Sequence, residues 1–229
     1  MCSNQPVDEL RVRMHHDPDV VCITNPSGCL ILPNEVEMQY NILYGLAKNP
    51  NVGAVIFVSL GCENIMSDKL YERIKDEKPS FYYIAQDDSS CAETASKLES
   101  KVLEFKGIIQ KQKREEVSIS DIRVGVQCGA SNWTTAAAAN PAIGYCSDLI
   151  VKNGGISVLG ETYGWFGGEG ILVKQSRTKE VADKIINLMT RIYDRCLFFG
   201  RRIEEANPAP GNIAGGITTL CEKSTWQHS

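Results

Sequence analysis

Three cysteines of this sequence lie in short glycine-containing segments that directly follow runs of β-forming residues. Cys29 and Cys62 each follow a glycine, and Cys128 precedes one. Thiolates that converge on one point make a soft site, suited to iron, zinc or an iron–sulfur cluster. The sequence contains no CxxC, so the spacing alone leaves open whether these cysteines bind a metal or are small packing residues.

Three glutamates lie among glycines and small residues in predicted loops, namely Glu63, Glu161 and Glu169. Burial can raise the pKa of a glutamate toward neutrality, and such a residue can exchange protons with a substrate. We therefore consider all three as catalytic residues, with a solvated or helix-capping carboxylate as the alternative for each. The three histidines lie in a polar stretch or beside the C-terminus, so a histidine-based hydrolase triad has little support.

The elements that must position these residues alternate between short β-rich runs and longer segments of helical periodicity. We expect strands at residues 20–24, 54–59, 81–85, 122–127 and 156–159. We expect helices over residues 35–48, 67–75, 90–114 and 178–205, with caps at Asn34, Ser67 and Ser90. The predicted fold class is α/β, with a parallel, doubly wound, Rossmann-like sheet that has helices on both faces.

Sheets of this kind bind their ligands beyond the carboxyl ends of the strands. Polar segments follow four of the predicted strands there, at residues 24–29, 61–64, 127–132 and 160–162. Three of these segments contain the glycine-flanked cysteines, and the fourth contains Glu161. This shared position makes them one candidate site.

The composition sets the class of protein and its organisation. A net charge of −4 without a concentrated basic face argues against a nucleic-acid partner. No apolar run approaches the ~18–20 residues that cross a bilayer, so we expect no membrane contact and a cytoplasmic protein with reduced thiols. From about residue 129 the chain is rich in Gly, Ala and Asn. We expect residues 1–229 to form a single α/β unit, or two lobes of about 1–128 and 129–229.

Long stretches of unusual sequence occur in order through nearly the whole chain. After Cys2-Ser3-Asn4 and Gly28-Cys29 they are LAKNPNVGAVIFVSLGCEN (46–64), VQCGASNWTTAAAANPAIGYCSDLIV (126–151), GGISVLGETYGWFGGE (154–169) and NPAPGNIAGGITTLCEKS (207–224). Together they resemble the large domain of the altronate and galactarate dehydratase family, which also includes the large subunit of sulfolactate sulfo-lyase.

The resemblance implies a metal-dependent carbon–oxygen lyase, a dehydratase, that acts on a sugar acid or related hydroxy-carboxylate. The reaction would begin with abstraction of the proton alpha to the carboxylate and end with beta-elimination. The implied cofactor is iron, as Fe2+ or an iron–sulfur cluster, or another divalent metal such as Mn2+. The implied metal ligands are Cys2, Cys29, Cys62 and Cys128.

The same resemblance implies which residues meet the substrate. The catalytic residues would be Glu161, Glu169 or Glu63. The substrate-binding residues would be Asn25, Ser131, Asn132, Asn140, Asn207, Asn212 and Lys223. The sequence departs from the family pattern at several of these points, because Asn25 stands where His is usual and Asn132 where Asp is usual.

Other functions stay open at this stage. The chain is shorter than the family's large domain, so we expect a separate small substrate-clamping subunit, or a further C-terminal part, to complete the site, and we expect a homo-oligomer. One alternative is a non-catalytic or partner-requiring subunit of the same fold that binds a small molecule or a metal. Others are a carbon–sulfur lyase subunit and a thiol-based redox protein.

Overall fold

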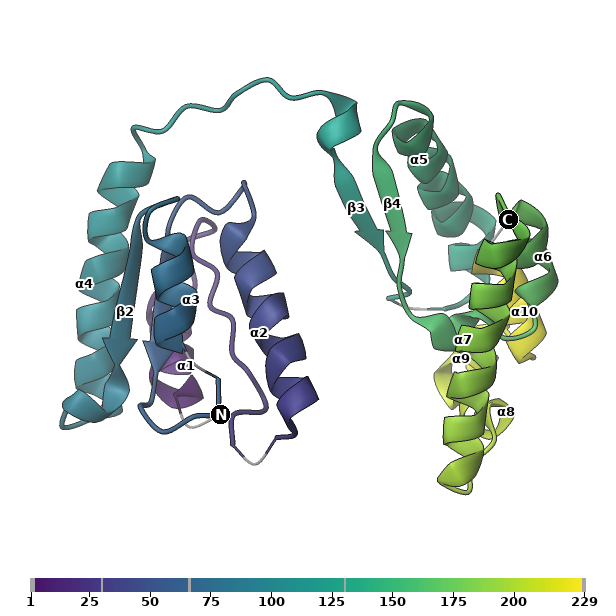
Figure 1. Cartoon of the computed structure of the whole chain (residues 1–229), viewed down its shortest axis with the longest axis horizontal. Helices are drawn as coiled ribbons and strands as arrows, with labels where there is room; N and C mark the ends of the chain where they lie inside the picture. The colour runs from purple at the N-terminus through teal and green to yellow at the C-terminus, as the bar shows by residue number, and fades with distance from the viewer. Residues whose placement is uncertain (1–2, 30, 66, 130, 228–229) are drawn as a thin grey trace. The chain divides into compact units, whose positions relative to one another are not determined.

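The chain divides into two compact units, which are described separately. The computed structural model describes residues 3–29, 31–65, 67–129 and 131–227. Unit 1 is Met1–Arg114 and unit 2 is Glu115–Ser229 (Figure 1). This division lies nearer the N-terminus than the 128/129 boundary considered from the sequence.

Unit 1 is built on a pair of parallel strands. Its elements are α1 (Asn4–Arg13), α2 (Pro33–Lys48), β1 (Val55–Ser59), α3 (Ser67–Ile74), β2 (Ser80–Ile84), the 3-10 turn η1 (Ala85–Asp87) and α4 (Cys91–Ile109). The register places Val55 opposite Ser80 and Ser59 opposite Ile84. Two parallel neighbours need a crossover connection, and α3 supplies it.

Helices cover both faces of this strand pair (Figure 1). On one face, Leu10 and Met14 of α1 and Leu98 of α4 form a buried cluster, against which Ile56, Val58 and Tyr83 of the strands pack. On the other face Tyr82 of β2 stacks on Tyr71 of α3 with 6.3 Å between ring centroids. Successive side chains of a strand point to opposite faces, so β1 and β2 each contribute to both layers.

The segment at residues 20–24, expected as a strand, is not part of a sheet. Its side chains nevertheless alternate as those of a strand do. Val20 and Cys22 pack against the cluster of α1 and α4, whereas Val21 and Ile23 are 78% and 56% exposed. The sequence periodicity therefore predicted which side chains are buried, but not the hydrogen bonding of the backbone.

Unit 2 also contains one pair of parallel strands. Its elements are η2 (Ile119–Asp121), β3 (Arg123–Val126), the π-helical turn η3 (Thr135–Ala139), α5 (Asn140–Lys152), β4 (Ile156–Leu159), η4 (Thr162–Trp165), α6 (Glu169–Gln175), α7 (Lys179–Phe198), α8 (Ile203–Ala206), α9 (Pro210–Ala214) and α10 (Leu220–Gln227). Arg123 lies opposite Ile156, and Val126 lies opposite Leu159.

The core of unit 2 gathers around α7. The buried residues are Phe166, Met189, Ile203 and Leu220, and Ile185, Ile192, Tyr193 and Cys196 of α7 pack against them. These residues of α7 therefore face the core of the unit. The helix is capped by Thr178, whose hydroxyl accepts from the amide of Val181. It ends at Phe198, before Gly200, which has a φ of 70°.

The helix that leads into α5 carries the π-helical turn η3. Pro141 follows this turn and has no backbone N–H. Inside a helix its ring would crowd the carbonyl four residues earlier, at Ala137. A local widening of the helix relieves that crowding, and π-turns of this kind are frequent at functional sites.

These elements confirm the prediction of an α/β fold with parallel strand pairing. The prediction of one doubly wound, Rossmann-like sheet is not confirmed, because the described residues form two separate sheets of two strands each, β1–β2 and β3–β4. The sequence predicted four of the strands, but a strand's own residues carry little information about which distant strand it pairs with.

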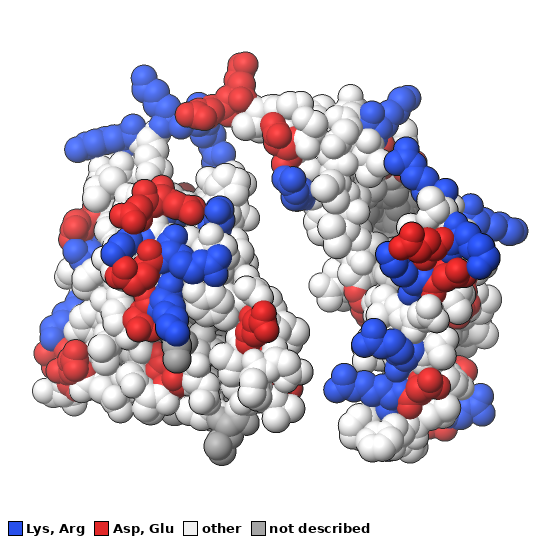
Figure 2. All heavy atoms as spheres, in the orientation of Figure 1, with Lys and Arg blue, Asp and Glu red and all other residues white. Residues whose placement is uncertain are grey.

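The surface that Figure 2 shows carries both charge signs. Among the described residues of each unit, Lys and Arg are interspersed with Asp and Glu on that face (Figure 2). Mixed charges of this kind are typical of a solvated surface. Within the described part of the chain, no helix is both long and apolar enough to span a bilayer.

Candidate functional site

The segment after β1 folds around the side chain of Glu63. One carboxylate oxygen accepts hydrogen bonds from the backbone amides of Leu60 (3.1 Å) and Gly61 (2.9 Å). The other accepts from the hydroxyls of Ser59 and Ser67, the latter at 3.3 Å. The carboxylate therefore binds residues on both sides of it in the sequence and braces the turn that contains Cys62.

These contacts set the charge of Glu63. Burial raises the pKa of its carboxyl group, but the hydrogen bonds from Ser59 and from the backbone amides of Gly61, Glu63 and Leu60 together lower it by more, so the pKa lies below its ordinary value. The raised pKa expected from the sequence is wrong for this residue, because the turn supplies donors to the ionised form. A catalytic role for Glu63 stays a prediction, and the geometry favours a part in organising the turn.

Hydrogen bonds join three separate segments of unit 1. The backbone amide of Asn64 donates to the carbonyl of Gly28 (2.9 Å), and the side-chain amide of Asn4 donates to the carbonyl of Asn25 (2.8 Å). The side-chain amide of Asn25 donates in turn to Gln39 Oε1 of α2 (2.9 Å). The start of α1, the turn before Cys29 and the turn that contains Cys62 are therefore connected.

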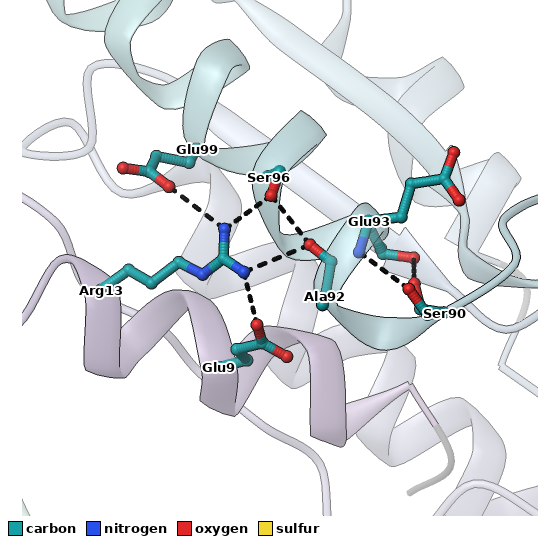
Figure 3. Close-up of polar contacts among 8 residues, drawn as sticks. Glu9, Arg13, Ser90, Ala92, Glu93, Ser96 and Glu99 are labelled. Carbon is teal, nitrogen blue, oxygen red and sulfur yellow. Dashed lines mark hydrogen bonds and ion pairs between the residues drawn. The ribbon is translucent and has the colours of Figure 1, made fainter.

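The helix that carries Asn4 is tied to α4 by Arg13 (Figure 3). The guanidinium pairs with Glu9 of its own helix and with Glu99 of α4 (3.4 Å). It also donates to Ser96 Oγ (2.7 Å) and to the carbonyl of Ala92 (3.3 Å). The hydrogen bond to Glu9 is the main cause that raises the pKa of Arg13. These contacts join α1 to α4, and both helices pack on the same face of the strand pair.

The four predicted cysteine ligands are distributed over both units. Cys29 and Cys62 are exposed thiols of unit 1, and Cys2 lies outside the described residues. Cys128 belongs to unit 2 and is half-buried, with its sulfur 2.9 Å from Ser131 Oγ. The described residues of either unit include no group of three His, Cys, Asp or Glu side chains that could hold a metal ion. Within one unit these residues do not fit a metal site, so the cysteine ligands and the metal stay predictions.

A pocket of about 800 Å³ lies in unit 2 at the carboxyl ends of β3 and β4. It is lined by the segments that follow these two strands, by the helical residues from Thr135 to Asp148 and by Lys223 of α10. Six residues that the sequence predicted as site residues line it: Cys128, Ser131, Asn132, Asn140, Glu161 and Lys223. The carboxyl ends of parallel strands are where open α/β sheets bind their ligands.

Two asparagines beside this pocket use their side chains to hold the backbone. Asn132 Oδ1 accepts from Thr134 Oγ1 (2.6 Å) and from the amide of Thr135 (3.0 Å), as a helix cap does. Asn212 Oδ1 accepts from the amide of Ala209 (3.0 Å), and its Nδ2 donates to the carbonyl of Ser131 (3.1 Å). Asn212 therefore joins the loop before α9 to the segment after β3.

Lys223 is the charged residue of the pocket that is most deeply buried. The residue is only 7% exposed, and its ammonium donates a hydrogen bond to Asn207 Oδ1 at 2.9 Å. Among the described residues it forms no ion pair. A buried charge without an opposite charge destabilises a fold. An anion bound in the pocket would supply the missing charge.

Glu161 and Glu169 lie in different places within unit 2. Glu161 lines the pocket with Lys223 and has a φ of 58°; no other non-glycine residue in the described ranges has a positive φ. Backbone strain of this kind is frequent at functional positions. Glu169 begins α6, accepts from the amide of Gly167 (2.9 Å) and lines a second pocket of about 470 Å³.

Several polar residues of the pocket were not predicted. They are Gln127, Thr135, Tyr145, Ser147, Asp148, Ser157 and Gln175. Three of the lining residues lie on α5. Ser147 follows Asn140 by seven residues and Asp148 follows it by eight, so all three lie on one face of the helix. No helix was expected there from the sequence, so this shared face was not predicted.

Two sequence models of one family match the chain in succession. The model described as D-galactarate dehydratase/Altronate hydrolase, second domain, matches residues 1–107, and the model described as D-galactarate/Altronate dehydratase, C-terminal, matches residues 119–227. The chain belongs to the galactarate/altronate dehydratase family. The interval between the two matches contains the division between unit 1 and unit 2. The family expected from the sequence motifs is thus confirmed.

Relatives of this dehydratase-family chain are longer than the chain itself. Altronate dehydratase of Bacillus subtilis (strain 168) is 32% identical over 209 residues, which are 90% of this chain and 41% of that protein. Altronate dehydratase of Escherichia coli (strain K12) is 31% identical over 208 residues, 90% of this chain and 41% of that protein. Subunit beta of (2R)-sulfolactate sulfo-lyase from Chromohalobacter salexigens is 29% identical over 209 residues, 89% of this chain and 52% of that protein. No solved structure matches the chain.

Proposed function

We propose that this family member is the core of a carbon–oxygen lyase, a dehydratase that acts on a sugar acid or related hydroxy-carboxylate in the pocket of unit 2. The observation that carries the proposal is the buried residue Lys223, which lines the pocket without an ionic partner among the described residues. A substrate carboxylate supplies the opposite charge through a charge-assisted hydrogen bond. The altronate dehydratases among the relatives support the reaction class.

The proposed reaction uses Glu161 and Lys223. The carboxylate of Glu161 takes the proton from the carbon next to the substrate carboxylate, while the ammonium of Lys223 stabilises the negative charge that develops there. The electron pair of that C–H bond forms a carbon–carbon double bond as the neighbouring C–O bond breaks. Glu161 returns its proton to the leaving hydroxyl group, so the products are water and an enol that becomes a 2-keto acid. No step is assigned to a metal ion.

Substrate screening tests the activity. Aldonates, aldarates and sulfolactate are supplied to the chain, and 2-keto acid or sulfite is measured. We expect Glu161→Gln to lower kcat by about 100-fold or more. Lys223→Met should raise KM, because it removes a contact to the bound carboxylate, and should also lower kcat, because it removes the stabilisation of the charge that develops in the transition state. The control is Glu180→Gln, at an exposed residue of α7 that pairs only with Lys184 in the described contacts.

The two glutamates of unit 2 are separated by the same assay. Glu161 lines the pocket of Lys223, whereas Glu169 lines the other one. If Glu169→Gln abolished turnover and Glu161→Gln left it unchanged, the assignment of Glu161 as the base would be wrong.

The predicted cofactor is tested separately. Iron, as Fe2+ or an iron–sulfur cluster, or another divalent metal such as Mn2+, is detected by anaerobic purification followed by a visible absorption spectrum and metal analysis. A colourless, metal-free protein whose Cys62→Ala variant behaves like the parent would remove the cysteine ligands from the proposal.

A second candidate is a subunit that requires a partner. The sulfo-lyase relative, of which this chain covers 52%, is named as a subunit. In this proposal a separate small substrate-clamping subunit completes the site, or copies of the chain assemble into a homo-oligomer. A chain that binds a carboxylate but is silent across the whole substrate panel would favour this candidate. Light scattering coupled to size-exclusion chromatography measures the oligomeric state.

A further inference from the structure

We infer that Asn207 is a positioning residue, which holds the ammonium of Lys223 in the unit 2 pocket without neutralising its charge. This inference rests on the proposed function of that pocket. The sequence resemblance implied that Asn207 itself binds substrate. In the structure its Oδ1 contacts the lysine, and it is not among the residues that line the pocket. A direct contact of Asn207 with substrate stays a prediction.

The contacts of Asn207 fix both ends of its side chain. Its Oδ1 accepts the hydrogen bond from Lys223 Nζ at 2.9 Å, and its Nδ2 donates to the carbonyl of Tyr163 at 3.5 Å. The next residue of α10, Ser224, is fully buried and donates to the carbonyl of Trp165 at 2.9 Å. Lys223 is therefore held from two sides, by the amide of Asn207 and by the anchored helix that carries it.

The charge of the hydrogen-bond partner determines whether the ammonium of Lys223 can still bind an anion. An ammonium has three N–H donors, and an amide oxygen takes one of them without bringing a charge. A carboxylate at the same position would form an ion pair with the ammonium of Lys223 and would compete there with any anion that enters the pocket. An amide therefore orients the lysine and keeps its charge available for an anion.

Unit 1 shows the other arrangement in the same chain. Lys97 pairs with Asp88, whose side chain is 1% exposed, and Lys106 pairs with Asp17, whose side chain is 12% exposed. In both pairs the acid satisfies the lysine, and neither lysine lines a described pocket. Lys223 differs from them in having a neutral partner and a position on a pocket wall.

The first experiment measures binding of D-gluconate, with D-glucitol as the matched probe that lacks the carboxylate. Isothermal titration calorimetry is performed on the full chain and on its Asn207→Asp and Lys223→Met variants. We expect Asn207→Asp to weaken gluconate binding by about tenfold or more, because the new carboxylate occupies the ammonium. Lys223→Met should abolish the preference for gluconate over glucitol.

A charge-matched control separates this effect from a change in net charge. Asn153 caps α5, and its Nδ2 donates to the carbonyl of Leu149 at 2.7 Å. Asn153→Asp adds the same negative charge to unit 2 without touching Lys223. We expect it to bind gluconate as the parent does.

The second experiment does not depend on a ligand. Trp133, Trp165 and Trp226 are the three tryptophans of the chain, and all lie in unit 2, so tryptophan fluorescence follows the unfolding of that unit. We expect Asn207→Asp to raise the midpoint of thermal unfolding by about 2–4 °C in the parent, because it pairs the buried charge. In a Lys223→Met background the same substitution should lower the midpoint, because the new carboxylate has no cation beside it.

These experiments can fail separately for the positioning role of Asn207 and for the proposed function of the unit 2 pocket. If Asn207→Asp bound gluconate as tightly as the parent while Lys223→Met did not, Asn207 would have no positioning role and the proposed pocket would stand. If the parent showed no preference for gluconate over glucitol, or Lys223→Met kept it, the proposed function would fail. The thermal cycle then decides on Asn207 alone: equal shifts of the midpoint in both backgrounds overturn the inference.

Discussion

Unit 1 and unit 2 are each built on two parallel strands, yet they cover these strands to different degrees. In unit 1, Leu70, Ile74 and Leu98 are at most 1% exposed. In unit 2, Ile156 and Val158 of β4 are 45% and 56% exposed. Burial of apolar area is the main source of stability. Unit 1 therefore has the more fully covered strands, whereas unit 2 combines exposed strand residues with a large pocket.

The largest effect is expected from the removal of a core side chain of unit 1. Leu98→Ala should lower the free energy of unfolding of unit 1 by about 2–5 kcal/mol, because this side chain of α4 is fully buried against α1 and the strand pair. Urea unfolding followed by far-UV circular dichroism measures the loss. Leu103→Ala, on the same helix but 57% exposed, should cost far less. If the urea midpoint followed by the tryptophan fluorescence of unit 2 shifted equally, the two units would unfold together and their stabilities could not be compared.

A substitution at a glycine of unit 2 should destabilise that unit and leave unit 1 unchanged. Gly167 has a φ of 88°, and a Cβ atom there would lie 2.6 Å from the Cα of Cys221. Gly167→Ala should therefore destabilise unit 2 by about 1–3 kcal/mol, from backbone strain and the contact with α10. Tryptophan fluorescence during urea unfolding reports it. Gly170→Ala is the control, because no atom lies within 4 Å of its added Cβ. Equal unfolding midpoints for both variants would argue against a tight contact at Gly167.

A third prediction concerns the acid stability of unit 1. The hydrogen bonds from Lys97 and Tyr83 lower the pKa of Asp88 from 3.8 to about 2. Since the folded pKa is below the unfolded value, the stability that Asp88 contributes is complete above about pH 4 and is lost as the pH falls toward 2. The urea midpoint, measured by far-UV circular dichroism between pH 5 and pH 2, should fall less steeply for Asp88→Asn than for the parent. Parallel pH profiles would contradict this role of Asp88.

The smallest effect is expected at the tie between α1 and α4. Arg13 pairs with Glu9 and Glu99, and its side chain is 28% exposed. Ion pairs near the surface contribute little, so Arg13→Gln should lower the thermal midpoint of unit 1 by about 1–2 °C. Differential scanning calorimetry detects such a shift. A much larger loss would indicate that α1 depends on this residue for its position.

The sequence predicted the local structure better than the arrangement of the strands. Residues 156–159 were expected as a strand and form β4 with the same bounds, and Ser90 caps α4 as expected. The helix expected over 178–205 ends earlier, at Phe198, because Gly200 adopts a positive φ. Strand pairing depends on contacts between distant segments, and the single sheet expected from the order of the elements is not confirmed.

The candidate site divides in the same way. The segments that follow β3 and β4 were expected to share a site, and they line one pocket together with Lys223. The partner of Lys223 and the separation of Glu161 from Glu169 did not follow from the sequence, since each depends on how α6 and α10 pack. The helix of residues 140–152 was missed because its Ala- and Gly-containing sequence was interpreted as a ligand-binding loop.

The hydrogen bonds that Glu63 accepts hold the turn that contains Cys62 in one conformation before any ligand binds. A turn that already forms hydrogen bonds with its own side chain, at Leu60, Gly61 and Ser67, has few backbone conformations left to lose. The ordering of a loop is one of the main costs of binding, and a pre-organised loop avoids most of it. Whatever meets the exposed thiol of Cys62 therefore meets a surface whose shape is set before the encounter.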